Sequence, residues 1–166
     1  MLALSENLML RVSAMQLDAV YDSFERGTCD TTGLAEPQYQ CPAGQPYIDL
    51  SGLKPSGIHD LSANANVVYS FNLGVVLDGF ARLEYVYEED TNVADLIPVS
   101  IAERGFKNVN ASVGLNADNW SVMFWGRNIT DHETLYSAFP TTAAPGSFSG
   151  YPSAPSTYGV TFKMNL

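Results

Sequence analysis

The chain has 166 residues, of which 46% are hydrophobic, 11% aromatic and 16% charged, so its charged fraction lies below that of ordinary soluble domains. The net charge of −10 argues against a nucleic-acid partner, because phosphate contacts need a basic surface. No stretch approaches the about 18 consecutive apolar residues of a membrane-spanning helix, and the first residues lack the regions of a secretory signal. The length predicts one domain.

Residues 8–21 form the first predicted element. From Ser13 onward, Met15, Leu17 and Tyr21 belong to an apolar set that alternates with a second set of side chains, which indicates a strand. A helix is the alternative, because Leu, Met and Ala favour helices.

Residues 22–58 are rich in glycine and proline and predict a long loop. Cys29 and Cys41, the only cysteines, both lie in this loop. Two ligands are too few for a zinc site, so we expect a disulfide, with two free thiols as the alternative. A disulfide would stabilise the fold by roughly 3 kcal/mol and would imply an oxidising compartment.

Two strands follow at residues 60–71 and 75–88, joined by a short turn. In both, apolar residues alternate with mostly polar ones, so each predicted strand has an apolar face. Arg82 and Glu84 lie on the other face of the second strand, where they could line an aqueous lumen, because facing lipid would be costly. Asp18 is a further candidate for such a lumen.

A second polar loop at residues 89–104 leads to strands at 106–116 and 120–128, with a tight turn between them. A third long loop at residues 131–156 carries four aromatic residues that either contact a ligand or pack the loop on itself: Tyr136, Phe139, Phe148 and Tyr151. The last strand, 157–166, has five apolar residues at a spacing of two: Tyr158, Val160, Phe162, Met164 and Leu166. About ten residues is also the length of a transmembrane β-strand.

Short turns and long loops alternate along these six strands, which predicts an all-β, antiparallel, up-and-down meander. The alternative is a soluble sandwich in which the last strand lies at an edge. Neither His59 nor His132 has a serine, cysteine or second histidine at a catalytic spacing, so we expect no enzymatic activity, catalytic residue, metal site or cofactor.

Four stretches resemble motifs of TonB-dependent outer-membrane receptors. Residues 120–131, ending in Asn128-Ile129-Thr130-Asp131, resemble the penultimate strand, and residues 155–162 resemble the closing strand. Residues 17–24 and 49–55 are similar to a strand end and a loop of the same family. The chain departs from the family pattern at Ser156, where arginine is usual, and at Leu166, where phenylalanine is usual.

The resemblance implies that the chain is the C-terminal part of a barrel of about 22 strands with a plugged lumen, in the bacterial outer membrane. Its short turns would be periplasmic and its long loops extracellular. Such receptors import a scarce ligand (an iron–siderophore, cobalamin or a carbohydrate) with energy from the TonB complex. The expected partners are the N-terminal barrel and plug of the same receptor, TonB through that plug, membrane lipid, and the barrel-assembly machinery, which would recognise the last strand. Without a plug or signal peptide, residues 1–166 would be a partial barrel domain. The alternatives are a small complete outer-membrane barrel with a structural role and a soluble β-rich binding module.

Overall fold

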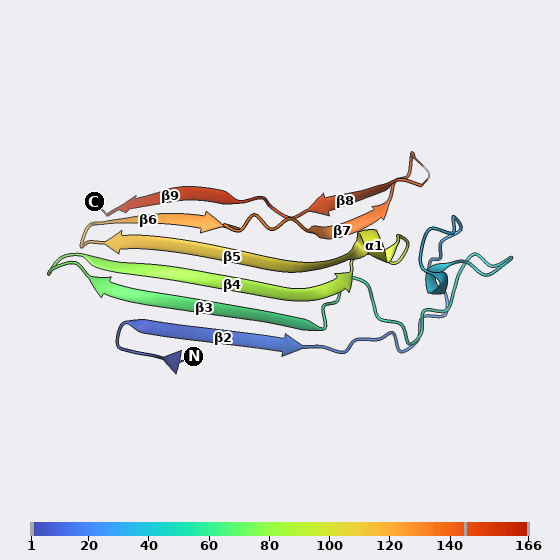
Figure 1. Ribbon diagram of the computed structural model, residues 1–166, viewed down its shortest axis with the longest axis horizontal. Helices are drawn as coiled ribbons and strands as arrows, with labels where there is room; N and C mark the ends of the chain where they lie inside the picture. The colour runs from blue at the N-terminus through green and yellow to red at the C-terminus, as the bar shows by residue number, and fades with distance from the viewer. Residues whose placement is uncertain (1, 145, 166) are drawn as a thin grey trace.

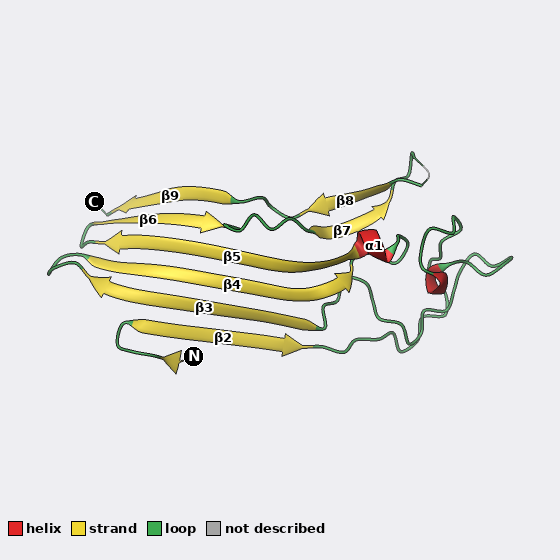
Figure 2. Cartoon of the chain, viewed as in Figure 1, coloured by secondary structure: helices red, strands yellow, loops and turns green. Residues whose placement is uncertain are grey.

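The computed structural model describes residues 2–144 and 146–165, and its main feature is one antiparallel β-sheet (Figures 1 and 2). Within this part, seven strands pair in the order β1-β2-β3-β4-β5-β6-β9, and a hairpin, β7-β8, forms a separate two-stranded sheet. The predicted all-β class is confirmed. The strands are β1 (Leu2–Ala3), β2 (Leu8–Gln16), β3 (Leu61–Asn72), β4 (Asp78–Asn92), β5 (Glu103–Asn116), β6 (Trp120–Arg127), β7 (Leu135–Pro140), β8 (Phe148–Pro152) and β9 (Thr157–Met164).

The connections differ in length between the two ends of the sheet. At the left end in Figure 1, residues 73–77 and 117–119 join consecutive strands by short turns. At the right end lie three long connections, residues 17–60, 93–102 and 128–156. The hydrogen bond from Ala117 N to Trp120 O (2.8 Å) closes one short turn. The sheet is therefore an up-and-down meander with all its long connections at one end.

The strand register divides the side chains into an apolar face and a polar face. Residues directly opposite one another in an antiparallel pair point to the same face. One row across the sheet pairs Leu10 with Val67, Val67 with Leu83, Leu83 with Ala111, Ala111 with Gly126 and Gly126 with Tyr158. A row on the opposite face pairs Arg11 with Asn66, Asn66 with Glu84 and Glu84 with Asn110. The alternation in the sequence therefore produces one apolar surface that continues from β2 to β9.

Aromatic side chains cover glycines on neighbouring strands at four places. In each pair the aromatic residue and the glycine lie directly opposite one another on paired strands: Phe71 and Gly79, Phe80 and Gly114, Trp125 and Gly159, and Tyr158 and Gly126. A β-carbon built at any of these glycines would collide with the covering ring. Glycine is therefore required at these positions, because any side chain would occupy the space of the ring.

The first strand differs from its prediction in both length and phase. β2 ends at Gln16 rather than at residue 21, because Tyr21 turns away to pack in the loop that follows. Its pairing with β3 places Ala14 opposite Ala63 on the apolar face, so Met15 lies on the polar face, opposite Ser62. The predicted apolar set at Met15 and Tyr21 was therefore wrong.

The two longest strands extend beyond their predicted bounds at the long-connection end. β4 starts at Asp78 rather than residue 75, because exposed Val75 and Val76 belong to the turn, and it continues to Asn92. β5 starts at Glu103 rather than residue 106. The second connection is thus shorter than the predicted 89–104, and it contains the short helix α1 (Val99–Ala102). A 3₁₀ turn, η1 (Pro37–Tyr39), lies in the first connection.

The third connection was predicted to be a loop without strands, but the structure shows two strands in it. It contains the β7-β8 hairpin, which pairs Phe139 with Ser149 and Ala138 with Gly150. The sheet itself stays open, because β9 has no partner strand along its outer edge among the described residues.

Candidate functional site

The three long connections meet at one end of the sheet and carry most of the charge of the chain. They contain ten of the eighteen acidic residues but only two of the eight basic ones, a net charge of −8 out of −10. The two basic residues already have partners. Arg26 lies over the Tyr47 ring at 4.9 Å, and Lys54 Nζ lies 2.6 Å from Asp60. This end therefore presents a negative field that attracts cations.

The first connection is folded around a disulfide. The Cys29 and Cys41 sulfur atoms are bonded at 1.93 Å, with their α-carbons 5.0 Å apart, as the sequence predicted. The bridge lies in a small apolar cluster whose buried members are Cys29, Ala35, Tyr39, Ile48 and Leu50. Tyr21 and Leu53 pack against this cluster, which explains why the chain leaves the sheet after Gln16.

Asp30 organises the segment inside the disulfide loop. Its carboxylate accepts hydrogen bonds from the backbone of Thr32, Leu34 and Ala35 at 2.8–2.9 Å and from the Thr32 hydroxyl at 2.6 Å. Burial alone would raise the pKa of Asp30, but these bonds favour the charged form and lower the pKa to about 2. All its close partners belong to its own loop, so Asp30 stabilises the loop rather than presenting a charge to a ligand.

The predicted loop aromatics lie on the β7-β8 hairpin but do not form one surface. Phe139 and Tyr151 pack together with ring centroids 5.8 Å apart, and Tyr136 packs on Phe106 at the same distance. Phe148 instead packs against a second apolar cluster, whose buried members are Ile97, Ala102 and Ala138. Tyr136 and Tyr151 remain more than half exposed. Thus one of the four supports the fold, and three are accessible to a ligand.

A cavity of about 330 Å³ lies between the three long connections. Its walls are mainly apolar, and the polar residues among them are Thr28, Ser56 and Asp95. The remaining lining residues are Phe24, Leu50, Val93, Ala94, Leu96, Ala138, Phe139 and Pro140. Its size and composition fall within the range of small-molecule sites.

Asp95 is the unusual member of this cavity. Its Oδ1 atom is buried and has no hydrogen-bond partner among the described residues. Burial raises the pKa of Asp95, and the Ser56 side chain opposes that shift only in part. Burial raises the pKa of Tyr39, and the nearby Asp95 carboxylate adds to this shift. Asp95 is not among the site residues predicted from the sequence, although a lone acidic residue inside the apolar run 93–97 is a signal for it.

The residues of the Asn128–Asp131 motif hold the segment that leads into β9. Asn128 is 3% exposed; its Nδ2 donates to Ala154 O (3.0 Å) and His132 O (3.2 Å), and its Oδ1 accepts from His132 N (3.0 Å). Asp131 Oδ1 accepts from Ser156 N at 2.8 Å. Both residues adopt positive φ, 48° at Asn128 and 51° at Asp131, a conformation that Asn and Asp tolerate better than most residues. The motif therefore has a structural role at this position.

The polar face carries a hydrogen-bonded network centred on Glu84. Its carboxylate accepts from Asn64 Nδ2 (3.2 Å) and Asn110 Nδ2 (3.1 Å), and Asn110 Oδ1 accepts from Asn128 N (3.0 Å). Arg82 and Glu84, two of the predicted lumen candidates, line a hollow of about 380 Å³ on this face. Asp18, the third candidate, lies outside the strands and is exposed.

Trp125 interrupts the polar face and has polar partners there. Its Nε1 donates to Thr161 Oγ1 (3.2 Å), and the Arg127 guanidinium lies 5.3 Å from its ring centroid. The ring therefore combines the cover over Gly159 with two polar contacts.

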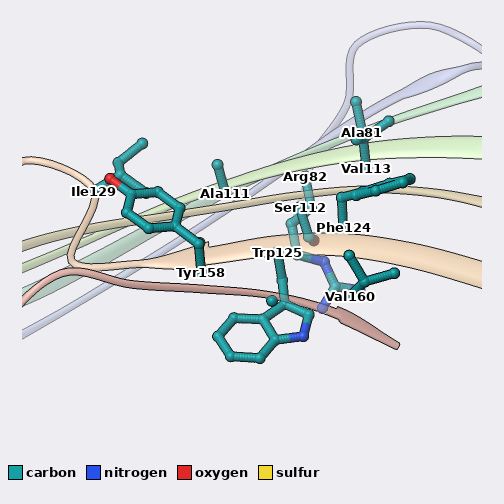
Figure 3. Close-up of a pocket in the computed structure, with 12 residues that line it drawn as sticks. Ala81, Arg82, Ala111, Ser112, Val113, Phe124, Trp125, Ile129, Tyr158 and Val160 are labelled. Carbon is teal, nitrogen blue, oxygen red and sulfur yellow. The ribbon is translucent and has the colours of Figure 1, made fainter. Parts of the chain in front are cut away.

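The predicted assembly residues lie together on the apolar face and are largely exposed. Tyr158, Val160, Phe162 and Met164 are each 58–67% exposed. Leu166, the fifth, lies outside the described residues. Beside them, a shallow hollow of about 660 Å³ is lined by Phe124, Tyr158 and Val160 (Figure 3). Figure 3 shows Tyr158, Ile129 and Ala111 grouped on one side of the sheet, with Trp125 on the other.

His59 contacts two glutamate residues near the long connections, and the backbone of His132 bonds to the Asn128 side chain. His59 Nε2 lies 3.4 Å from the Glu88 carboxylate, and its Nδ1 contacts Glu89 O. In the part of the chain that the structure describes, no group of three or more His, Cys, Asp and Glu side chains is arranged to hold a metal ion.

None of the described helices is long and apolar enough to cross a membrane. Comparison of the chain with models of protein families, with curated proteins and with solved structures gave no match.

Proposed function

We propose that this chain forms part of the wall and outer loops of a TonB-dependent receptor in the bacterial outer membrane. The observation that carries the proposal is the apolar face, which continues across six strands and exposes large side chains throughout. Exposed members include Val12 on β2, Leu83 on β4, Phe124 on β6 and Phe162 on β9. Lipid contact accounts for such a face, because outer-membrane strands alternate lipid-facing apolar residues with lumen-facing polar ones.

The arrangement of connections supports the same proposal. Short turns lie at one end of the sheet and long connections at the other, which is typical of outer-membrane barrels. The polar face would line the lumen, where Arg82 and Glu84 would meet water rather than lipid. The open edge of β9 would pair with a further strand of the receptor, because lipid does not tolerate unpaired backbone groups.

The sequence motifs support the receptor function, and this geometry is compatible with it. In a complete receptor, the plug would contact TonB, and the strands of this chain would supply wall and surface loops around the ligand path. The transported ligand would be a scarce compound such as an iron–siderophore, cobalamin or a carbohydrate. A plug and further alternating strands are expected in frame upstream of Met1, and an unrelated upstream sequence would contradict the receptor assignment.

Two adjacent residues of β6 test the orientation of the sheet. Phe124 lies on the proposed lipid face, and Met123 lies on the opposite face. An arginine facing the bilayer centre costs about 2–4 kcal/mol, whereas one facing the lumen costs little. We therefore expect Phe124→Arg to reduce the fraction of the chain that floats with phospholipid vesicles and Met123→Arg to leave it nearly unchanged. Equal effects of the two substitutions, or recovery of the chain as a monomer without detergent, would contradict the proposal.

A further inference from the structure

The cavity between the long connections contains an acceptor atom whose partner is missing from the described residues. Asp95 Oδ1 is buried and makes no hydrogen bond there, although a carboxylate has acceptor capacity on both oxygens. Buried polar groups in proteins are nearly always paired with protein, water or a ligand. Asp95 as a residue is only half-buried and lines the cavity, so its carboxylate has acceptor capacity that a ligand can use.

No basic side chain of the described residues lines the cavity. The two basic residues of the long connections are engaged elsewhere, Arg26 with Tyr47 and Lys54 with Asp60. The surrounding connections have a net charge of −8, which would concentrate cations and repel anions. The missing donor is thus best supplied by a positively charged group.

The rest of the cavity fits an apolar body attached to that charge. Leu50 and Leu96 form part of the wall, together with the aromatic residues Phe24 and Phe139, which are 37% and 40% exposed. Phenylalanine faces also attract cations, which adds to the preference for positive charge. Thr28 and Ser56 offer further hydroxyl groups.

We propose that this cavity binds a small organic cation, an ammonium or guanidinium group on an apolar body, with the charged group donating to the Asp95 carboxylate. This proposal rests on the proposed function only for the role of the cavity, which would be a ligand-recognition site on the outer side of the receptor. Charge-assisted hydrogen bonds to this half-buried carboxylate would give the site its specificity.

Saturation-transfer NMR on the full chain in detergent tests the proposal with two probes of similar shape and opposite charge, 2-phenylethylammonium and phenylacetate. We expect 2-phenylethylammonium to bind at least about tenfold more tightly than phenylacetate, because the anion would face Asp95 and a negative surface. This comparison uses the unsubstituted chain, so it does not depend on the folding of a variant. Equal binding of the two probes, or no binding of either at millimolar concentration, would overturn the proposal.

Two substitutions that each remove one negative charge test whether the probe binds at Asp95. Asp95→Asn should weaken 2-phenylethylammonium binding by about tenfold or more, because the negative charge of the acceptor is lost. Asp90→Asn removes the same charge from an exposed residue that does not line the cavity, so we expect less than about a twofold change. Equal effects would show that the probe responds only to net charge, which would refute the site. Vesicle flotation of the Phe124 and Met123 variants is read independently, so failure of this inference and failure of the membrane proposal are distinguishable.

Discussion

Replacing Asn128 by alanine removes three hydrogen bonds and places at a φ of 48° a residue that tolerates positive φ less well than asparagine does. The residue is 3% exposed, and its side chain bridges the backbone of His132 and Ala154, so the deletion removes the link between these two segments. At about 1 kcal/mol for each net hydrogen bond, the loss is about 3 kcal/mol. A left-handed conformation costs alanine about 1 kcal/mol more. We therefore expect Asn128→Ala to lower the free energy of unfolding by about 4 kcal/mol.

A second substitution at the same position separates the two contributions. Asn128→Gly loses the same hydrogen bonds but tolerates a φ of 48°, so it should be more stable than Asn128→Ala by about 1 kcal/mol. Asn119→Ala is the control, because Asn119 is exposed in the short turn before β6. This control should change stability by less than about 0.5 kcal/mol.

Urea titration in detergent micelles, followed by tryptophan fluorescence, measures these free energies. Trp125 lies three residues before Asn128 and reports on this part of the sheet. An Asn128→Ala variant as stable as the control would refute the role of the side chain in holding the segment before β9. An Asn128→Gly variant no more stable than Asn128→Ala would refute the argument from backbone conformation.

Two further predictions concern the disulfide loop and the cover over Gly159. Since the pKa of Asp30 is lowered from 3.8 to about 2 on folding, its charge stabilises the fold by roughly 2 kcal/mol above pH 4, and this contribution is lost as the pH falls from 3.8 through about 2. Unfolding free energies measured against pH should therefore converge for the parent chain and Asp30→Asn at the acid end, and a pH-independent gap would contradict the assignment. Gly159→Ala should cost about 1–3 kcal/mol, because the added methyl group displaces the Trp125 ring and breaks its bond to Thr161. In a double-mutant cycle with Trp125→Ala most of this cost should disappear, and full additivity would show that the ring is not the cause.

The strands were predictable because their periodicity is local. Six of the strands in the described sheet follow from alternation in the sequence, and the apolar sets of β3, β4, β5, β6 and β9 have the predicted phase. The phase of β2 was not predictable from its own residues, because both of its faces carry apolar side chains. Pairing with β3 decides it, and that pairing joins segments about fifty residues apart.

The long connections were less predictable because their structure depends on contacts between distant segments. Prolines and serines interrupt the alternation of β7 and β8, and the hairpin is fixed partly by packing of Ala138 and Phe148 near Ile97. The cavity containing Asp95 combines residues from three connections, so no window of the sequence contains the site. The cysteine pairing was accessible by contrast, because only one pair of cysteines exists.

The pairs of aromatic rings and glycines also determine how far each strand can slide along its neighbour. A slip of one residue would move every apolar side chain to the wrong face, so alternation already excludes it. A slip of two residues would preserve both faces, and alternation alone cannot distinguish it from the native register. After such a slip of β9, Trp125 would lie opposite Thr157 or Thr161, whose side chains would occupy the space of the ring above Gly159. Each ring therefore selects among the registers that hydrophobicity leaves equivalent, and in a closed barrel the sum of these registers sets the tilt of the strands and the diameter of the pore.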